Sequence, residues 1–149
     1  MIELLKAKHF FSAKDKEKII EAIEAAERLT SGEIRVHVES GCGKDTIVRA
    51  KEVFEKLGMV STELRNGVLI YLAIKERRFA IIGDQGINEV VPANFWEETK
   101  EQMSIYFKEG CFVDGVCYGI NSTGRQLAAH FPYKSNDVNE LSNDISEGI

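Results

Sequence analysis

A continuous apolar run at residues 68–74 constrains the fold of this chain more than any other feature of its sequence. A short apolar run bounded by turn residues is typical of a strand that is buried on both faces. It is far shorter than the roughly 20 residues that a membrane-spanning helix needs. A polar turn leads from it to a second apolar segment, residues 79–82. Because the connection is short, we expect an antiparallel hairpin whose two strands are central in a sheet covered by helices.

A third strand is predicted upstream of this hairpin. Residues 33–39 alternate between apolar and polar side chains, which is typical of a half-buried strand. Apolar residues at helical spacing predict a helix for residues 47–57, between this strand and the apolar run. Strand–helix–strand crossovers are usually right-handed and join parallel strands. The sheet is therefore expected to be mixed.

Helical patterns mark three further segments. Ser12 and Asp15 resemble a capping box, and apolar residues recur at helical spacing from there to Leu29. Pro92 is placed to begin a helix that runs to Gly110, and a last helix is expected from near residue 114 to residue 132. With helices before, between and after the strands, we predict an α/β fold: a three-layer α/β/α sandwich around a small mixed β-sheet.

The chain has 149 residues, which suits one compact domain that needs neither disulfides nor a structural metal. We assign residues 1–133 to this domain. Residues 134–149 contain four acidic residues against a single lysine and few apolar groups. We expect this acidic C-terminal tail to be mobile or lightly docked.

Charge and targeting signals bear on the partners of the chain. The net charge is −5 and no basic cluster is longer than Arg77-Arg78, which argues against nucleic acid. These two arginines could bind a phosphate. The simpler interpretation is that their charge keeps the exposed edge of the hairpin from pairing with another strand. The first residues lack the apolar region of a secretory signal, and no segment is long enough to cross a bilayer. We therefore expect a cytoplasmic protein that does not bind membranes.

The predicted hairpin decides where polar side chains gather. Its second strand runs antiparallel to the other two strands and so ends beside their starting points. Oxygen-bearing side chains of three loops then meet at one edge of the sheet; the candidate metal ligands among them are Glu33, Glu63, Asn66, Asp84 and Asn88. Carboxylates and amides are ligands that Ca²⁺ and Mg²⁺ prefer. The alternative interpretation is that these are solvated loop residues, with Asp84 and Asn88 making turn or capping hydrogen bonds.

A second polar group follows the strand at residues 33–39, at the opposite edge of the sheet. It consists of Glu39, Cys42 and Asp45, with Glu76 in the turn of the hairpin. The helix dipole adequately explains Asp45 near a helix start. On the polar face of the strand, His37 is expected to be packed under a helix or at the rim rather than catalytic.

Four sequence blocks, in this order along the chain, resemble the TPM domain family. They are TSGEIRVHV at residues 30–38, RNGVLIYLA at 65–73, FAIIGDQGI at 79–87, and Phe107-x-x-Gly110-x-Phe112-x-x-Gly115. The resemblance extends over residues 10–132. It implies an α/β/α sandwich around a small mixed sheet, divalent metal binding as in some members, and acid phosphatase activity as in a plant member.

The resemblance also implies a role for particular residues. Residues 83–86 (GDQG) correspond to a metal loop, with Glu63 and Asn66 as neighbours through the hairpin geometry. Many members of the family are exported or membrane-anchored, whereas this chain resembles a stand-alone, cytoplasmic bacterial version.

Three functions stand as hypotheses. The first is a non-catalytic, regulatory module in which a divalent ion, calcium before magnesium, orders the loops at residues 62–66 and 83–89. The second is a metal-assisted acid phosphatase, with Asp84 as nucleophile or metal ligand and Arg65 or Arg78 stabilising the phosphoryl group. Against this second hypothesis, the sequence contains no Asp-x-Asp nucleophile block, no Cys-x5-Arg loop and no histidine pair. The third is an interaction domain whose acidic tail binds an unidentified protein.

Overall fold

The computed structural model describes residues 10–134 and 140–148. The helices are α2 (Ala13–Glu27), α3 (Thr46–Lys56), α4 (Gln85–Asn88), α5 (Glu97–Lys108) and α6 (Phe112–Ala128). The strands are β1 (Glu33–Glu39), β2 (Gly67–Ala73), β3 (Arg78–Gly83) and β4 (Ser146–Glu147).

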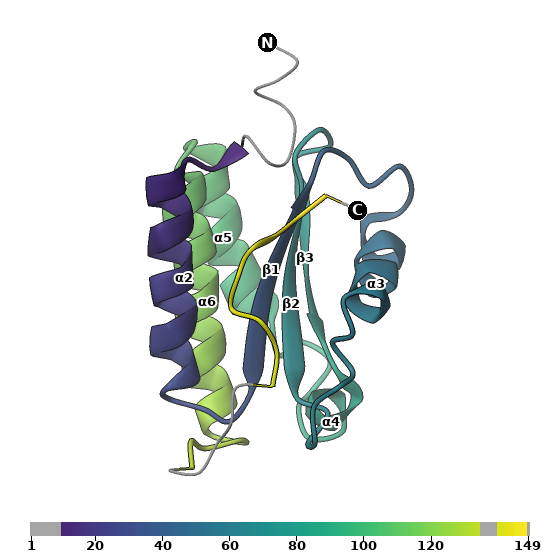
Figure 1. Ribbon diagram of the computed structural model, residues 1–149. Coiled ribbons are helices and arrows are strands. Elements are labelled where there is room, and N and C mark those ends of the chain that lie inside the picture. Colours follow the sequence, from purple (N-terminus) through teal and green to yellow (C-terminus); the bar gives the residue numbers. More distant parts are fainter. Residues whose placement is uncertain (1–9, 135–139, 149) are drawn as a thin grey trace.

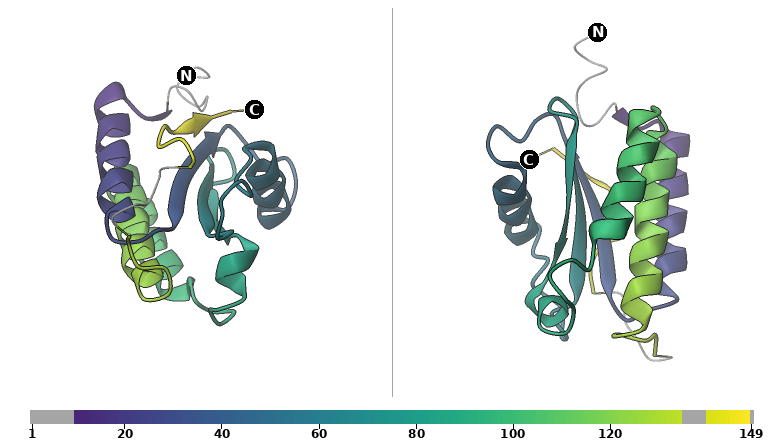
Figure 2. Two further views of the ribbon diagram at one scale, coloured as in Figure 1. Left: turned by 60° about the horizontal axis from the view of Figure 1, so that its bottom comes forward. Right: turned by 180° about the vertical axis from the view of Figure 1, so that it is seen from behind.

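The protein is built in three layers around a mixed sheet (Figure 1). Helices α2, α5 and α6 cover one face of the sheet, and α3 covers the other, with α4 at one end (Figure 2). The strand order is β3-β2-β1-β4. Strands β1 and β2 are parallel, and β2 and β3 are antiparallel. The predicted α/β sandwich, its crossover and its hairpin are therefore confirmed.

Two strands differ in burial from the prediction. Strand β3 lies at the edge of the sheet, and only Ala80 and Ile81 in it are fully buried. The polar residues of β1, expected at a half-buried surface, include His37 and Glu39, which are both buried. Alternation records polarity alone, so it does not reveal that the polar groups of this face bond to one another and to α3.

Helix boundaries follow local chemistry. The predicted capping box is present, with Ser12 and Asp15 each bonding the backbone N–H of the other. The prediction that a helix begins at Pro92 is wrong, because α5 begins at Glu97 after a series of turns. In α6, a Cβ on Gly124 would lie 2.8 Å from the Cβ of Ala26, so the glycine permits close packing of α6 on α2.

The acidic tail is docked in its described part. Residues 140–148 follow the open edge of β1 and end in β4, which pairs in parallel with β1 at His37 and Val38. The Gly148 N–H donates to the Val38 carbonyl at 2.8 Å, and Glu147 forms an ion pair with Lys16 of α2 at 2.8 Å. Of the two expectations for the tail, the structure thus supports docking for these residues.

No helix in the described part of the chain is long and apolar enough to cross a membrane.

Candidate functional site

Three loops meet where β1 and β2 begin and β3 ends (Figure 1). The strand register pairs Glu33 with Gly67 and Val68 with Gly83. Backbone hydrogen bonds extend this pairing into the loops: the Glu33 N–H donates to the Asn66 carbonyl at 3.3 Å, and the Asp84 N–H to the Gly67 carbonyl at 2.9 Å. The predicted meeting of these loops is confirmed. We call residues 27–33, 62–67 and 83–89 the acidic end of the molecule.

The tail joins two of the predicted ligands at the acidic end. Glu33 is only 3% exposed, and its Oε1 accepts a hydrogen bond from the Glu140 N–H at 2.7 Å. The Glu140 carboxylate in turn accepts from the Glu63 N–H at 3.2 Å. Asn66 is buried, and its side-chain amide donates to the Ser31 hydroxyl at 3.4 Å. Glu33, Asn66 and the Glu63 backbone therefore share one neighbourhood, whereas the Glu63 side chain is exposed.

A second carboxyl group lies beside Glu33. Glu27 ends α2, and its Oε2 accepts a hydrogen bond from the Ile34 N–H at 3.0 Å. Burial is the main cause that raises the pKa of Glu27, the bond from Ile34 opposes it, and the hydrogen bond and negative charge of Glu33 add to it, so that the pKa is about 8. Glu27 and Glu33 thus form a carboxyl pair that holds a proton at neutral pH.

Asp84 has a different set of contacts. It is the N-cap of α4, and its Oδ1 accepts from the Gln85 N–H at 2.7 Å. Arg65 binds both of its oxygens, with Nε 2.7 Å from Oδ2 and Nη2 2.9 Å from Oδ1. Asn88 is exposed and donates from its amide to the Gly83 carbonyl at 3.1 Å. These are the capping and turn bonds of the alternative interpretation, so the described contacts separate Asp84 and Asn88 from Glu33 and Asn66.

Close packing against the neighbouring backbone explains the glycine at position 86. A Cβ there would lie 2.1 Å from the carbonyl oxygen of Leu64 and 2.6 Å from that of Arg65. The Gly86 N–H also donates to the Arg65 carbonyl at 2.9 Å. Glycine therefore lets α4 rest directly on the loop that presents Arg65 to Asp84.

The side-chain atoms that could ligate a metal ion at the acidic end are all oxygens. Within residues 10–134 and 140–148, no group of three or more His, Cys, Asp or Glu side chains is arranged to hold a metal ion. The groups that do lie together are the Glu27 and Glu33 carboxyls, next to the Ser31 hydroxyl and the Asn66 amide. Carboxyl, hydroxyl and amide oxygens are chemically suited to a hard cation. Further ligands would have to come from backbone carbonyls, water or a movement of Glu140.

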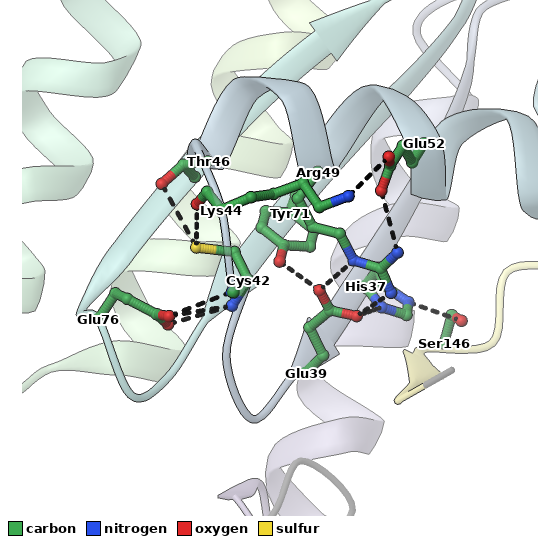
Figure 3. A network of polar contacts seen from close by, with 11 residues as sticks. His37, Glu39, Cys42, Lys44, Thr46, Arg49, Glu52, Tyr71, Glu76 and Ser146 are labelled. Atoms are coloured by element: carbon green, nitrogen blue, oxygen red, sulfur yellow. Dashed lines mark hydrogen bonds and ion pairs between the residues drawn. The ribbon is translucent and has the colours of Figure 1, made fainter.

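Polar residues on the α3 side of β1 form a buried network (Figure 3). Glu39 accepts from Arg49 Nε at 2.8 Å and Nη2 at 3.0 Å, and also from the Tyr71 hydroxyl. His37 has no exposed surface; its Nε2 lies 3.1 Å from Glu39 Oε1, and its Nδ1 2.9 Å from the Ser146 hydroxyl of β4. We call these five residues the His37–Glu39 network.

The network fixes the charges of its members. Burial would raise the pKa of Glu39, but the hydrogen bonds from Arg49, Tyr71 and His37 outweigh it and hold the pKa at about 2. Burial lowers the pKa of His37 below 6.5 although Glu39 opposes this shift. The imidazole is therefore neutral and enclosed at pH 7, and the prediction that His37 is packed is confirmed.

The remaining residues of this second group hold the chain in place. Both carboxylate oxygens of Glu76 accept from the Cys42 N–H, at 3.1 and 3.2 Å. Asp45 is the N-cap of α3 and accepts from the N–H groups of Ile47 and Val48. The structural interpretation of Asp45 is thus confirmed.

The profile of the TPM domain matches residues 5–126 of the chain. The chain belongs to the TPM domain family. The BA42 protein from the psychrophilic bacterium Bizionia argentinensis is 45% identical to it, with a TM-score of 0.90 over 96% of this chain and 99% of that one. The N-terminal domain of a P. gingivalis protein shares the fold at 16% identity, with a TM-score of 0.65 over 85% of this chain and 83% of that one. No curated protein matches the chain.

Sequence reasoning missed three features of the acidic end of this TPM domain. Glu27 has the pattern of a solvated helix residue, and only its place just before a short turn into β1 signals that it returns to Glu33. The pairing of Arg65 with Asp84 joins positions 19 residues apart. Glu140 reaches Glu33 from 107 residues away. No local pattern encodes contacts over such distances.

Proposed function

We propose that this TPM domain is a non-catalytic module that binds a divalent cation at its acidic end, with calcium as the first candidate and magnesium as the second. The ion would order the loops at residues 62–66 and 83–89 and so alter a surface, which suits a regulatory role. The proposed ligands remain Glu33, Glu63, Asn66, Asp84 and Asn88, and Glu27 joins them. Calcium is favoured because it accepts six to eight oxygens in irregular geometry, whereas magnesium demands a near-ideal octahedron.

The Glu27–Glu33 carboxyl pair carries this proposal. Burial and Glu33 raise the pKa of Glu27 to about 8, so the pair holds a proton where two negative charges would repel each other. A divalent cation would neutralise both carboxylates and displace this proton. Binding should therefore release protons and should tighten as the pH rises toward 8.

Calorimetric titration of calcium into chelator-treated protein tests the proposal. At pH 7, in two buffers of different ionisation enthalpy, we expect saturable binding and the release of up to about one proton per ion. Glu33→Gln should weaken binding at least about tenfold, and Glu27→Gln should abolish proton release. Glu21→Gln, an exposed position on the same helix, is the matched control and should behave as wild type. No binding at millimolar calcium, or unchanged affinity in Glu33→Gln, would reject the site.

Asp84 is tested separately because Arg65 already binds its carboxylate. For Asp84 to ligate the ion, this ion pair must open. If it does, Asp84→Asn should weaken calcium binding sharply, since a hard cation prefers a charged oxygen. Equal affinity in Asp84→Asn and wild type would remove Asp84 from the ligand set and leave the ion with Glu27 and Glu33.

The acid phosphatase hypothesis has weaker support from the same contacts. The Arg65 guanidinium is bound to Asp84, and Arg78 begins β3 while Asp84 follows its other end. Neither arginine is thus ready to stabilise a phosphoryl group at Asp84. Hydrolysis of an aryl phosphate by the purified protein, lost in Asp84→Ala, would favour the phosphatase over the binding module.

A further inference from the structure

A cavity of about 600 Å³ lies at the end of the sheet opposite the acidic end. It is formed by the end of β2, the start of β3, the end of α5 and the start of α6. Its lining includes four phenylalanines: Phe10, Phe79, Phe107 and Phe112. Ligand pockets typically have volumes of about 300–1,000 Å³ and mostly apolar walls. The cavity therefore has the size and lining of a small-molecule site.

Three cations belong to the same lining. Arg77 comes from the β2–β3 connection, Arg78 from the start of β3 and Lys108 from the end of α5, and all three are exposed. The lining contains no acidic residue, and none of the three cations has an ion pair among the described residues. The nearby Glu76 is turned toward the Cys42 N–H. The cavity thus has a positive rim on a chain whose net charge is −5.

The backbone at Arg77 is also unusual. Its φ of +55° lies in the left-handed region, where glycine is less strained than a residue with a side chain. Strained positions of this kind are enriched at binding sites. Contact between the Arg77 side chain and an anion would explain why arginine, rather than glycine, occupies this position.

We propose that this cavity binds a fatty acid, with its hydrocarbon chain among the phenylalanines and its carboxylate at the positive rim. The apolar lining would remove the chain from water. The planar guanidinium groups of Arg77 and Arg78 suit a carboxylate, which they can bind through two parallel hydrogen bonds.

Residues 1–9 are the competing occupant, because the chain reaches the cavity at Phe10. This segment contains Ile2, Leu4 and Leu5, but it also carries Lys6 and Lys8 against a single acidic residue, Glu3. This segment therefore has a net positive charge, which the positive rim repels. Charge complementarity favours the fatty acid.

The test compares dodecanoate with dodecanol, which has the same chain length and no charge. Each is titrated into the full chain below the micelle concentration, with calorimetry and amide NMR spectra. We expect saturable binding of both, tighter for dodecanoate, with shifts concentrated at residues 72–79 and 104–112. The double variant Arg77→Ala/Arg78→Ala should weaken dodecanoate about tenfold, because each exposed charge pair contributes about threefold. Its affinity for dodecanol should be unchanged.

Two controls separate the cavity from the general charge of the surface. Lys75→Ala removes a cation from the same turn but outside the lining, and should leave both affinities unchanged. Ser104→Trp places a large ring in the cavity and should abolish binding of both ligands. A melting curve checks its fold, and Ser104→Leu is the smaller replacement if tryptophan is not accommodated.

Three results would overturn the proposal. The first is equal dodecanoate affinity in wild type and the double arginine variant. The second is binding with chemical-shift changes away from residues 72–79 and 104–112. The third is no fatty acid binding together with nuclear Overhauser contacts from the methyl groups of Leu4 and Leu5 to Phe79 or Phe107, which would make the N-terminal segment the occupant. None of these results depends on whether the acidic end binds metal.

Discussion

Glu39 shows how much a single buried charge can organise. It is 5% exposed and receives hydrogen bonds from Arg49, Tyr71 and His37. Removal of one partner from a buried ion pair typically costs about 3–5 kcal/mol. We expect Glu39→Gln to lower the free energy of unfolding by about 3 kcal/mol in urea at pH 7. Glu52→Gln, which removes an exposed partner of the same arginine, should cost less than about 1 kcal/mol.

The low pKa of Glu39 also predicts an acid dependence. The folded protein holds this pKa at about 2 against an ordinary 4.5, so the stabilisation is complete above pH 4.5 and is lost as the pH falls toward 2. The difference in unfolding free energy between wild type and Glu39→Gln should therefore shrink between pH 5 and pH 2.5. A constant difference would show that packing, not charge, accounts for the effect.

Glu27 predicts the opposite dependence on pH. Its pKa is raised to about 8 in the folded protein from an ordinary 4.5, so its contribution is complete below pH 4.5 and is lost as the pH rises through 8. Without metal, the melting temperature of Glu27→Gln should rise relative to wild type between pH 5 and pH 8.5. Glu21→Gln is again the control, and parallel pH profiles for wild type and Glu27→Gln would contradict the raised pKa.

At the scale of elements, the short helix α4 depends on a close approach of two backbones. A side chain at position 86 would collide with the carbonyl oxygens of Leu64 and Arg65, which cannot move as a flexible side chain can. Gly86→Ala should therefore destabilise the protein by about 1–3 kcal/mol in urea unfolding. At Gly83 the nearest atom is a side-chain carbon 3.4 Å away, so Gly83→Ala should have a much smaller effect. Similar losses in both variants would contradict this account.

The C-terminal strand gives a second prediction at this scale. Residues 140–148 are attached through the β4 pairing, the Lys16–Glu147 ion pair and the bond from the Glu140 N–H to Glu33. Removal of residues 140–149 should leave the rest folded but lower the free energy of unfolding by about 2 kcal/mol, because several modest hydrogen bonds are lost. Loss of a binding partner in the same variant, with unchanged calcium affinity, would favour the acidic-tail hypothesis.

For the whole molecule, sequence patterns predicted the architecture because they are local. The apolar run that became β2, the alternation in β1 and the helical periodicities each occupy consecutive residues, and crossover handedness then fixes the strand directions. The hydrogen-bond partners of His37 and Glu39 were not predictable in this way, because Arg49, Tyr71 and Ser146 come from three other elements. The two-residue strand β4 is too short to leave a pattern.

The candidate site follows the same division. Strand direction alone predicted that Glu33, Asn66 and Asp84 would meet at one end of the sheet, and their backbones do. The partners of their side chains depend on how the elements pack. In the folded chain Asp84 binds Arg65, and Glu27 and the Glu140 N–H contact Glu33.

The opposite placement of the acidic end and the positive cavity rim has a consequence for how the molecule meets others. The seven residues of β2 span about 23 Å and separate Glu33 and the exposed Glu63 at one end from Arg77 and Arg78 at the other. These two groups of charges give the protein an electric dipole along its strands. Long-range fields act on such a dipole before contact and orient the approaching molecule. A negatively charged surface would therefore turn the protein so that the mouth of the cavity arrives first.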